Sequence, residues 1–154
     1  MKNSYWNIFT VSKRILSKTI KVLSSENVIA LPTETVYGLA GNAYSKVAVK
    51  KIFKLKSRPK FNPLIIHYYN IQQAKNDIVL NDNFKKLYKK LSPGPITFIL
   101  KKKKNSKIQS IANAKLKTVA VRFPKHKIVR SILKKIKFPL AMPSANISSN
   151  LSPV

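Results

Sequence analysis

The sequence has no cysteine, only three glycines and only four acidic residues among its 154 positions. The lack of cysteine excludes a disulfide, a thiolate zinc site and a cysteine nucleophile. The three glycines do not form a G-x-x-x-x-G-K pattern, so a P-loop or Rossmann phosphate cradle is absent. Two histidines and four scattered carboxylates argue against a three-histidine zinc site, a protein-built metal cage and paired-carboxylate hydrolysis.

Long apolar runs are also missing. No stretch approaches the roughly 20 apolar residues of a membrane span, and the N-terminus shows no apolar core of a signal peptide. Hydrophobic residues make up 44% of the chain, and its length suits one domain with one core. We therefore expect residues 1–154 to form a single cytoplasmic domain with no membrane partner.

The net charge of +27 is the most unusual property of the composition. Only four of the 31 basic residues are arginines, whereas a surface selected for phosphate recognition usually carries more of them. Two explanations stay open. The lysines reflect codon drift in an AT-rich genome, or they were selected for a nucleic-acid partner. In either case the positive field attracts polyanions at low salt.

Apolar residues recur with helical spacing in several segments, which predicts helices. The first follows Ser12, a residue suited to cap a helix N-terminus. The predicted helices span about three turns after Ser12 and residues 46–56, 71–76, 84–91 and 127–137.

Apolar runs of strand length separate these helices. The predicted strands span residues 28–31, 63–67, 96–100, 118–123 and 140–142. The run 63–67 is continuously apolar, as in a strand covered on both faces. We expect residues 33–41 to form a loop that enters a brief helical turn. Strands that alternate with helices indicate the α/β class.

Two permanent cations, Lys56 and Arg58, stand two residues apart before Pro59. A residue before proline avoids the α region, so the helix should end near Ser57 and the chain should continue extended. In an extended chain both cations point to one side, where they would suit a triphosphate. The alternative is that both are surface residues of a very basic protein.

Other polar residues stand at strand ends. His67 ends an apolar strand and is either a hydrogen-bonded core or rim histidine or a ligand-binding residue. Arg122 lies within an apolar strand and needs a partner there, which would be a ligand carboxylate or a backbone carbonyl. Thr118 faces the same side as Arg122. Ser144 and Asn146 are either turn formers or hydrogen-bond donors to phosphate.

These residues belong to five stretches that resemble the threonylcarbamoyl-AMP synthase (YrdC/TsaC-like) family, in the family's order. They are LPTETVYGLAGNA (31–43), KSRPKFNPLIIH (56–67), SPGPITFIL (92–100), TVAVRFPKH (118–126) and MPSANISS (142–149). The resemblance covers roughly residues 26–153. It implies a twisted mixed sheet with flanking helices around a large, positively charged concave cavity.

The resemblance also implies the reaction. L-Threonine, bicarbonate or CO2, and ATP give threonylcarbamoyl-AMP and pyrophosphate, with Mg²⁺ accompanying ATP and no protein-built metal site. The product feeds the tRNA threonylcarbamoyl-transferase machinery, which forms N6-threonylcarbamoyladenosine at tRNA position 37.

Site residues follow from the resemblance, motif by motif. The threonine site would comprise Thr35, His67, Arg122 and the backbone at Met142. The ATP site would comprise Arg58, Asn62, Thr118, Ser144 and Ser152. The family's K-x-R and S-x-N signature, which we assign to catalysis, is met by Lys56 with Arg58 and by Ser144 with Asn146. No residue resembles a strong general base, so catalysis would rest on positioning and electrostatics.

Two departures from the family pattern bear on function. Met142 stands where a small residue is usual. The family pattern also continues with a C-terminal segment ending in a G-x-[ES]-S-T-like motif, so we expect a YrdC-like domain that lacks this segment. The alternative to the synthase is a non-catalytic module of the same fold that binds double-stranded RNA or tRNA.

Overall fold

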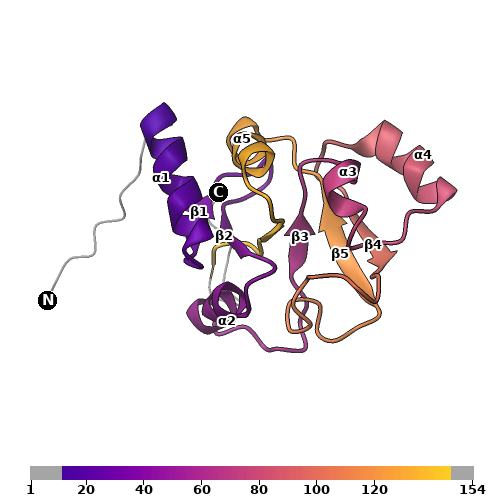
Figure 1. Ribbon diagram of the computed structural model, residues 1–154, viewed down its shortest axis with the longest axis horizontal. Coiled ribbons are helices and arrows are strands. Elements are labelled where there is room, and N and C mark those ends of the chain that lie inside the picture. The colour runs from indigo at the N-terminus through magenta and orange to yellow at the C-terminus, as the bar shows by residue number, and fades with distance from the viewer. Residues whose placement is uncertain (1–11, 147–154) are drawn as a thin grey trace, which may run out of the picture.

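The computed structural model describes residues 12–146, which form a six-stranded mixed sheet flanked by helices (Figure 1). The strands are β1 (Ile29–Leu31), β2 (Gly38–Asn42), β3 (Ile65–His67), β4 (Thr97–Lys101), β5 (Thr118–Arg122) and β6 (Leu140–Ala141). Their order across the sheet is β1-β2-β6-β3-β5-β4. Only β3 and β5 pair in parallel, and the other neighbours are antiparallel. The predicted α/β class and mixed sheet are confirmed.

The helices begin where the sequence indicates. They are α1 (Lys13–Ser24), α2 (Lys46–Leu55), α3 (Ile71–Ala74), α4 (Asp82–Leu91) and α5 (Lys127–Lys135). Side-chain oxygens of Ser12, Ser45, Asn70 and Asn81 accept backbone N–H groups at the first four N-termini. Each cap satisfies a donor that the helix itself leaves unpaired. The predicted helices are therefore confirmed, and their ends differ by only a few residues.

The segment after the first strand differs from its prediction. Residues 38–42 form β2, which pairs with both β1 and β6, rather than a helical turn. A Cβ atom on Gly38 would collide with Cγ of Met142 and lie 2.9 Å from its Sδ. The absence of a side chain at Gly38 thus lets β2 approach the end of β6. This requirement is a contact across about 100 residues of chain, which local spacing does not report.

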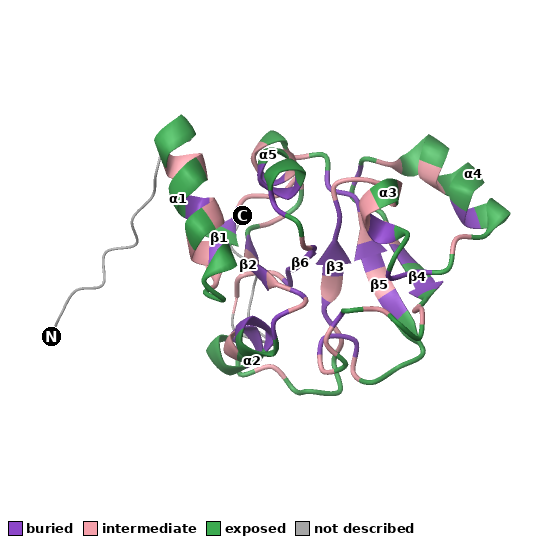
Figure 2. Ribbon diagram, in the orientation of Figure 1, coloured by how far each residue is buried: buried purple, intermediate pink, exposed green. Residues whose placement is uncertain are grey.

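Two apolar clusters pack against the sheet. The larger one joins α2, α3 and α4 to β3, β4 and β5, and includes Ile52, Ile66, Phe84 and Val121. The smaller one joins α1 and α5 to β1, β2 and β6, and includes Leu23, Ile132 and Leu140. Figure 2 shows the buried residues gathered on the strands and on the inner sides of α2 and α5. None of the helices in residues 12–146 has the length and apolar character needed to cross a membrane.

The smaller cluster leaves part of its side of the sheet uncovered. Along β5 the burial alternates, so Val119 and Val121 are buried while Thr118, Ala120 and Arg122 are not. On β3, Ile66 joins the large cluster and Ile65 is only partly buried. The prediction that residues 63–67 are covered on both faces is therefore wrong for Ile65. The uncovered side of β3 and β5 holds the candidate site.

Candidate functional site

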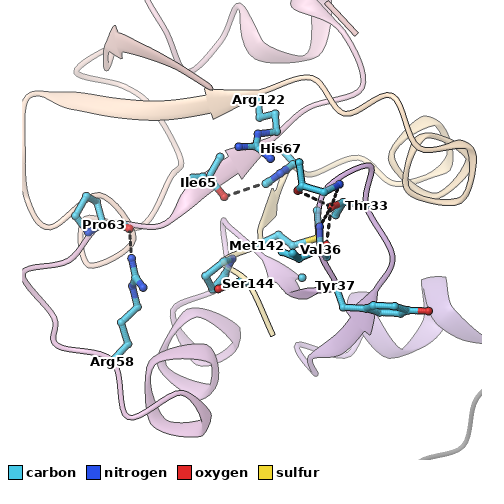
Figure 3. A pocket seen from close by; sticks show the side chains of 13 residues that line it. Thr33, Val36, Tyr37, Arg58, Pro63, Ile65, His67, Arg122, Met142 and Ser144 are labelled. Atoms are coloured by element: carbon cyan, nitrogen blue, oxygen red, sulfur yellow. Dashed lines mark hydrogen bonds between the residues drawn. The ribbon is translucent and has the colours of Figure 1, made fainter. Parts of the chain in front are cut away.

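A cavity of about 260 Å³ lies where β3, β5 and the end of β6 meet the turn between β1 and β2 (Figure 3). Its lining residues are Thr33, Thr35, Val36, Tyr37, Gly38, Arg58, Pro63, Ile65, His67, Arg122, Met142, Pro143 and Ser144. The lining contains two guanidinium groups and no carboxylate. In Figure 3, Arg122 and His67 lie together at one end and Arg58 lies at the other, with Met142 and Ser144 between them. This arrangement suits a ligand with two separate anionic groups.

At one end, parallel pairing of β3 with β5 sets His67 beside Arg122. Nε and Nη2 of Arg122 donate to Oγ1 of Thr97, at 3.0 and 2.9 Å. Thr97 is the antiparallel partner of Arg122 on β4, so its hydroxyl supplies the partner that we expected from a carboxylate or a backbone carbonyl. A hydroxyl does not neutralise the guanidinium, whose charge therefore remains available to an anion in the cavity.

Two effects shift the pKa of Arg122 in opposite directions. Desolvation by burial lowers the pKa of Arg122, and the negative charge of Glu34 opposes this shift. Glu34 also binds the segment that leads into α5, where its Oε2 accepts the backbone N–H groups of Lys125 and His126 at 3.2 and 3.3 Å. Its other oxygen, Oε1, is buried without a hydrogen-bond partner in the described part of the chain.

His67 is only 2% exposed although it lines the cavity. Its Nδ1 lies 3.2 Å from the carbonyl oxygen of Ile65. Burial, and then the positive charge of Arg122, lower the pKa of His67 to about 3. The imidazole is thus neutral at neutral pH, and it can exchange hydrogen bonds without adding charge beside Arg122.

The turn after β1 forms the wall beside this pair, and Thr33 organises it. Oγ1 of Thr33 accepts the N–H groups of Thr35 and Val36 and donates to the carbonyl of Val36 at 2.6 Å. Oγ1 of Thr35 lies 3.1 Å from that of Thr33. The sequence interpretation singled out Thr35 and missed Thr33. A threonine hydroxyl that binds the backbone two residues later is a known local turn motif, and Thr33 forms one.

Lys56 and Arg58 do not form the extended pair that the sequence predicts. Lys56 is the C-cap of α2 with helical backbone angles, and Ser57 follows with a φ of 48°. The chain therefore turns between the two cations, and their side chains diverge. Nζ of Lys56 donates to the carbonyl oxygens of Ser144 and Asn146. Pro59 restricts only the backbone of Arg58, so the helix ends near Ser57 as predicted but the chain is not extended from Lys56 to Arg58.

Arg58 instead reaches the loop that leads into β3. Its Nη2 donates to Oδ1 of Asn62 at 2.8 Å and to the carbonyl of Pro63 at 3.0 Å, and its Nε donates to the carbonyl of Asn62 at 3.1 Å. These three bonds hold the guanidinium at the cavity wall. Burial lowers the pKa of Arg58 from its usual value. Asn62 itself is exposed and contributes as the partner of Arg58.

Six of the predicted site residues line the cavity. They are Thr35, Arg58, His67, Arg122, Met142 and Ser144. Met142 donates its backbone N–H to Ile65 at 3.0 Å, and its side chain is 3% exposed. Four others lie outside the lining: Lys56, Asn62, Thr118 and Asn146. Ser152 lies outside the described residues.

The outlying residues have different relations to the cavity. Thr118 is exposed on β5, four residues before Arg122 and on the same side of the sheet. The sequence interpretation missed Thr97, whose role follows from the pairing of β4 with β5 and has no local signal. In residues 12–146 there is no group of three histidine, aspartate or glutamate side chains that could hold a metal ion.

Comparison with known proteins identifies the family to which this chain belongs. The Sua5_yciO_yrdC family model, described as "Telomere recombination", matches residues 21–154. The threonylcarbamoyl-AMP synthase of Bacillus subtilis is 39% identical over 140 residues, which cover 90% of this chain and 40% of that protein. The threonylcarbamoyl-AMP synthase of Pyrococcus abyssi is 39% identical over 154 residues, covering 95% and 44%. The chain thus spans less than half the length of these two relatives.

The fold comparison agrees. The crystal structure of Pyrococcus abyssi Sua5 complexed with L-threonine aligns with a TM-score of 0.88 at 36% identity. The alignment covers 94% of this chain and 42% of that one. The similarity of fold therefore extends over almost the whole of this chain.

Proposed function

Because the chain belongs to the Sua5/YciO/YrdC family, we propose that it is an L-threonylcarbamoyladenylate synthase, which makes threonylcarbamoyl-AMP and pyrophosphate from L-threonine, bicarbonate or CO2, and ATP. The observation that carries the proposal is the cavity itself. One end combines Arg122, His67 and Thr35, the other end holds Arg58, and Ser144 lies between them. These ends match an amino acid and a nucleotide held side by side.

The end at Arg122 would bind threonine. A guanidinium fork pairs well with a carboxylate, and Thr97 holds this fork by two hydrogen bonds. The neutral imidazole of His67 and the hydroxyl of Thr35 are suited to the polar groups of an amino acid. The backbone at Met142 completes this end. The related Sua5 of Pyrococcus abyssi has been solved with L-threonine bound, which supports the choice of substrate.

The end at Arg58 would bind ATP. Arg58 brings a positive charge to the cavity wall, and Ser144 brings a hydroxyl. Asn62, Thr118 and Ser152 would complete the nucleotide site. Mg²⁺ would enter with the ATP phosphates, because the lining offers no carboxylate to hold it alone.

The chemistry needs positioning more than a strong base. The amine of threonine takes up CO2 and loses a proton, giving N-carboxythreonine. Its carboxylate oxygen attacks the α-phosphorus of ATP, and the bond to the bridging oxygen breaks as pyrophosphate leaves with the electron pair. Arg58 would stabilise the charge that develops on pyrophosphate, while Arg122 would hold the other reactant in line. We propose that the product passes in the cytoplasm to the machinery that forms N6-threonylcarbamoyladenosine in tRNA.

Pyrophosphate release tests this proposal. The full chain, with ATP, Mg²⁺ and bicarbonate, is expected to release pyrophosphate when threonine is added and not when alanine replaces it. Arg122→Lys keeps the charge but loses the fork, so its KM for threonine should rise about tenfold or more. Arg14→Lys, an exposed site on α1, is the matched control and should leave the KM unchanged.

Two outcomes would contradict the proposal. Release with alanine but not with threonine would overturn the choice of amino acid. No release with either, together with retention of tRNA at moderate salt, would favour a non-catalytic RNA-binding module.

A further inference from the structure

Lys56 is a charged side chain in an interior position. It is the C-cap residue of α2, it is 2% exposed, and it is absent from the cavity lining. Nζ lies 2.6 Å from the carbonyl oxygen of Ser144 and also donates to that of Asn146. An ammonium group removed from water costs several kcal/mol unless it is well hydrogen-bonded, so both contacts are needed to keep it inside.

The loop that Lys56 binds is held from its other side as well. Gly38 and Ser144 form a β-bridge, and the N–H of Ala145 donates to the carbonyl of Tyr37 at 2.7 Å. Residues 144–146 are thus fixed between the start of β2 and the end of α2. Ser144 faces the cavity from this loop. Its position therefore depends on both attachments.

The same contacts leave Lys56 poorly placed to bind a phosphate. An ammonium has three protons, and two of them are directed at the carbonyls of the loop. Arg58, two residues later, lines the cavity. Burial lowers the pKa of Lys56, and the positive charge of Arg58 lowers it further. The two cations of the K-x-R signature consequently have separate environments, one interior and one at the cavity.

We propose that Lys56 is a positioning residue, which holds the Ser144–Asn146 loop in its binding conformation through two backbone carbonyls and does not itself contact the phosphates. The functional consequence rests on the synthase activity proposed above, but the placement of the loop does not. Loss of the ammonium should release the loop from one of its two attachments. A phosphate ligand should not change the surroundings of Lys56.

Amide hydrogen exchange tests the positioning. In the full chain, K56M should raise the exchange rate of the Ala145 N–H about tenfold or more, because an apolar side chain cannot bind the two carbonyls. K56R, which keeps several donors, should recover part of the protection. K54M is the control, since Lys54 is exposed two residues earlier in the same helix, and it should exchange like the wild type. Wild-type exchange at Ala145 in K56M would overturn the proposal.

Reductive methylation of the wild-type chain gives a test that needs no variant. Lys54 should be methylated readily, and Lys56 should resist with or without pyrophosphate as the probe. Ready methylation of Lys56 that pyrophosphate suppresses would overturn the proposal, because it would show an exposed ammonium that binds phosphate.

Kinetics separate this proposal from the proposed function. K56M should lower kcat about tenfold or more, while product inhibition by pyrophosphate stays within about threefold of wild type, and K56R should restore part of kcat. A parallel loss of kcat and of pyrophosphate inhibition would instead identify Lys56 as a direct ligand. If the wild type releases no pyrophosphate, the proposed function fails, and the exchange and methylation results still decide the role of Lys56.

Discussion

His67 combines a buried position with a titratable group, and this has a consequence for stability. Its pKa is about 3 in the folded chain and 6.5 when unperturbed. Below about pH 6.5, His67 takes up a proton in the unfolded chain but not in the folded chain. Stability from this group is therefore complete above about pH 6.5 and is lost progressively as the pH falls toward 3.

Urea denaturation measures this effect. Between about pH 6.5 and 5, His67 alone should make the free energy of unfolding fall as the pH is lowered. The slope should approach about 1.4 kcal/mol per pH unit, which is the maximum for a group that binds one proton. His67→Gln should remove that contribution. Equal slopes in the variant and the wild type would show that His67 is protonated in the folded chain.

Single residues also show where local sequence patterns stop being informative. The chemistry of Arg122 required a partner, and the choice of the Thr97 hydroxyl depended on the register of β4 against β5. Lys56 and Arg58 diverge because one backbone residue, Ser57, adopts a positive φ. Neither fact has a signal within a few residues of the side chain concerned.

At the scale of the elements, β2 is the strand that the sequence pattern does not reveal. Three of its five residues are glycine or alanine and none is β-branched, so it lacks the β-branched content that marks a strand. It forms because it lies between β1 and β6 and because Gly38 leaves room for Met142. Strand formation here follows from packing, not from local preference.

A double-mutant cycle tests this contact. Gly38→Ala should destabilise the chain by about 1–3 kcal/mol, because the new methyl group collides with Met142. Met142→Ala alone should also destabilise by leaving a cavity. The double variant should be more stable than the sum of the two predicts, since the methyl group then has space. Additive free energies of unfolding from urea denaturation would show that the two sites do not touch.

The remaining elements were predictable because their signals are local. The helical spacing of α1, α2 and α4 and the predicted cap at Ser12 coincide with the structure. The N-terminus of α5 shows the limit, because histidine is not among the preferred N-cap residues, yet Nδ1 of His126 accepts the N–H of Ile128 there.

For the molecule as a whole, the net charge of +27 is hardly compensated within the fold. Among residues 12–146 there is one ion pair, Lys85 with Asp82, and both side chains are largely exposed. Asp77, another of the four acids, is buried and accepts hydrogen bonds from Tyr44, Tyr68 and Ser106. Repulsion among the lysines therefore opposes the compact state.

Added salt should stabilise the protein for this reason. Between about 0.05 M and 0.5 M NaCl, screening should raise the free energy of unfolding on the order of 1 kcal/mol, or about 2–4 °C in Tm for a chain of this size. Thermal denaturation followed by circular dichroism measures the change, and sucrose at matched osmolality serves as the control. A Tm that falls with NaCl would mean that attractive pairs, not repulsion, dominate.

The sequence alone determined the α/β class, most helices and strands, and the ordered motifs that identify the family, because these depend on spacing and chemistry within short segments. Only the tertiary structure decided which side chains meet. The parallel register of β3 and β5 sets His67 beside Arg122, and the loop after β6 supplies the carbonyl oxygens that bind Lys56. Such contacts join residues tens of positions apart, and their geometry is fixed by packing of the whole sheet.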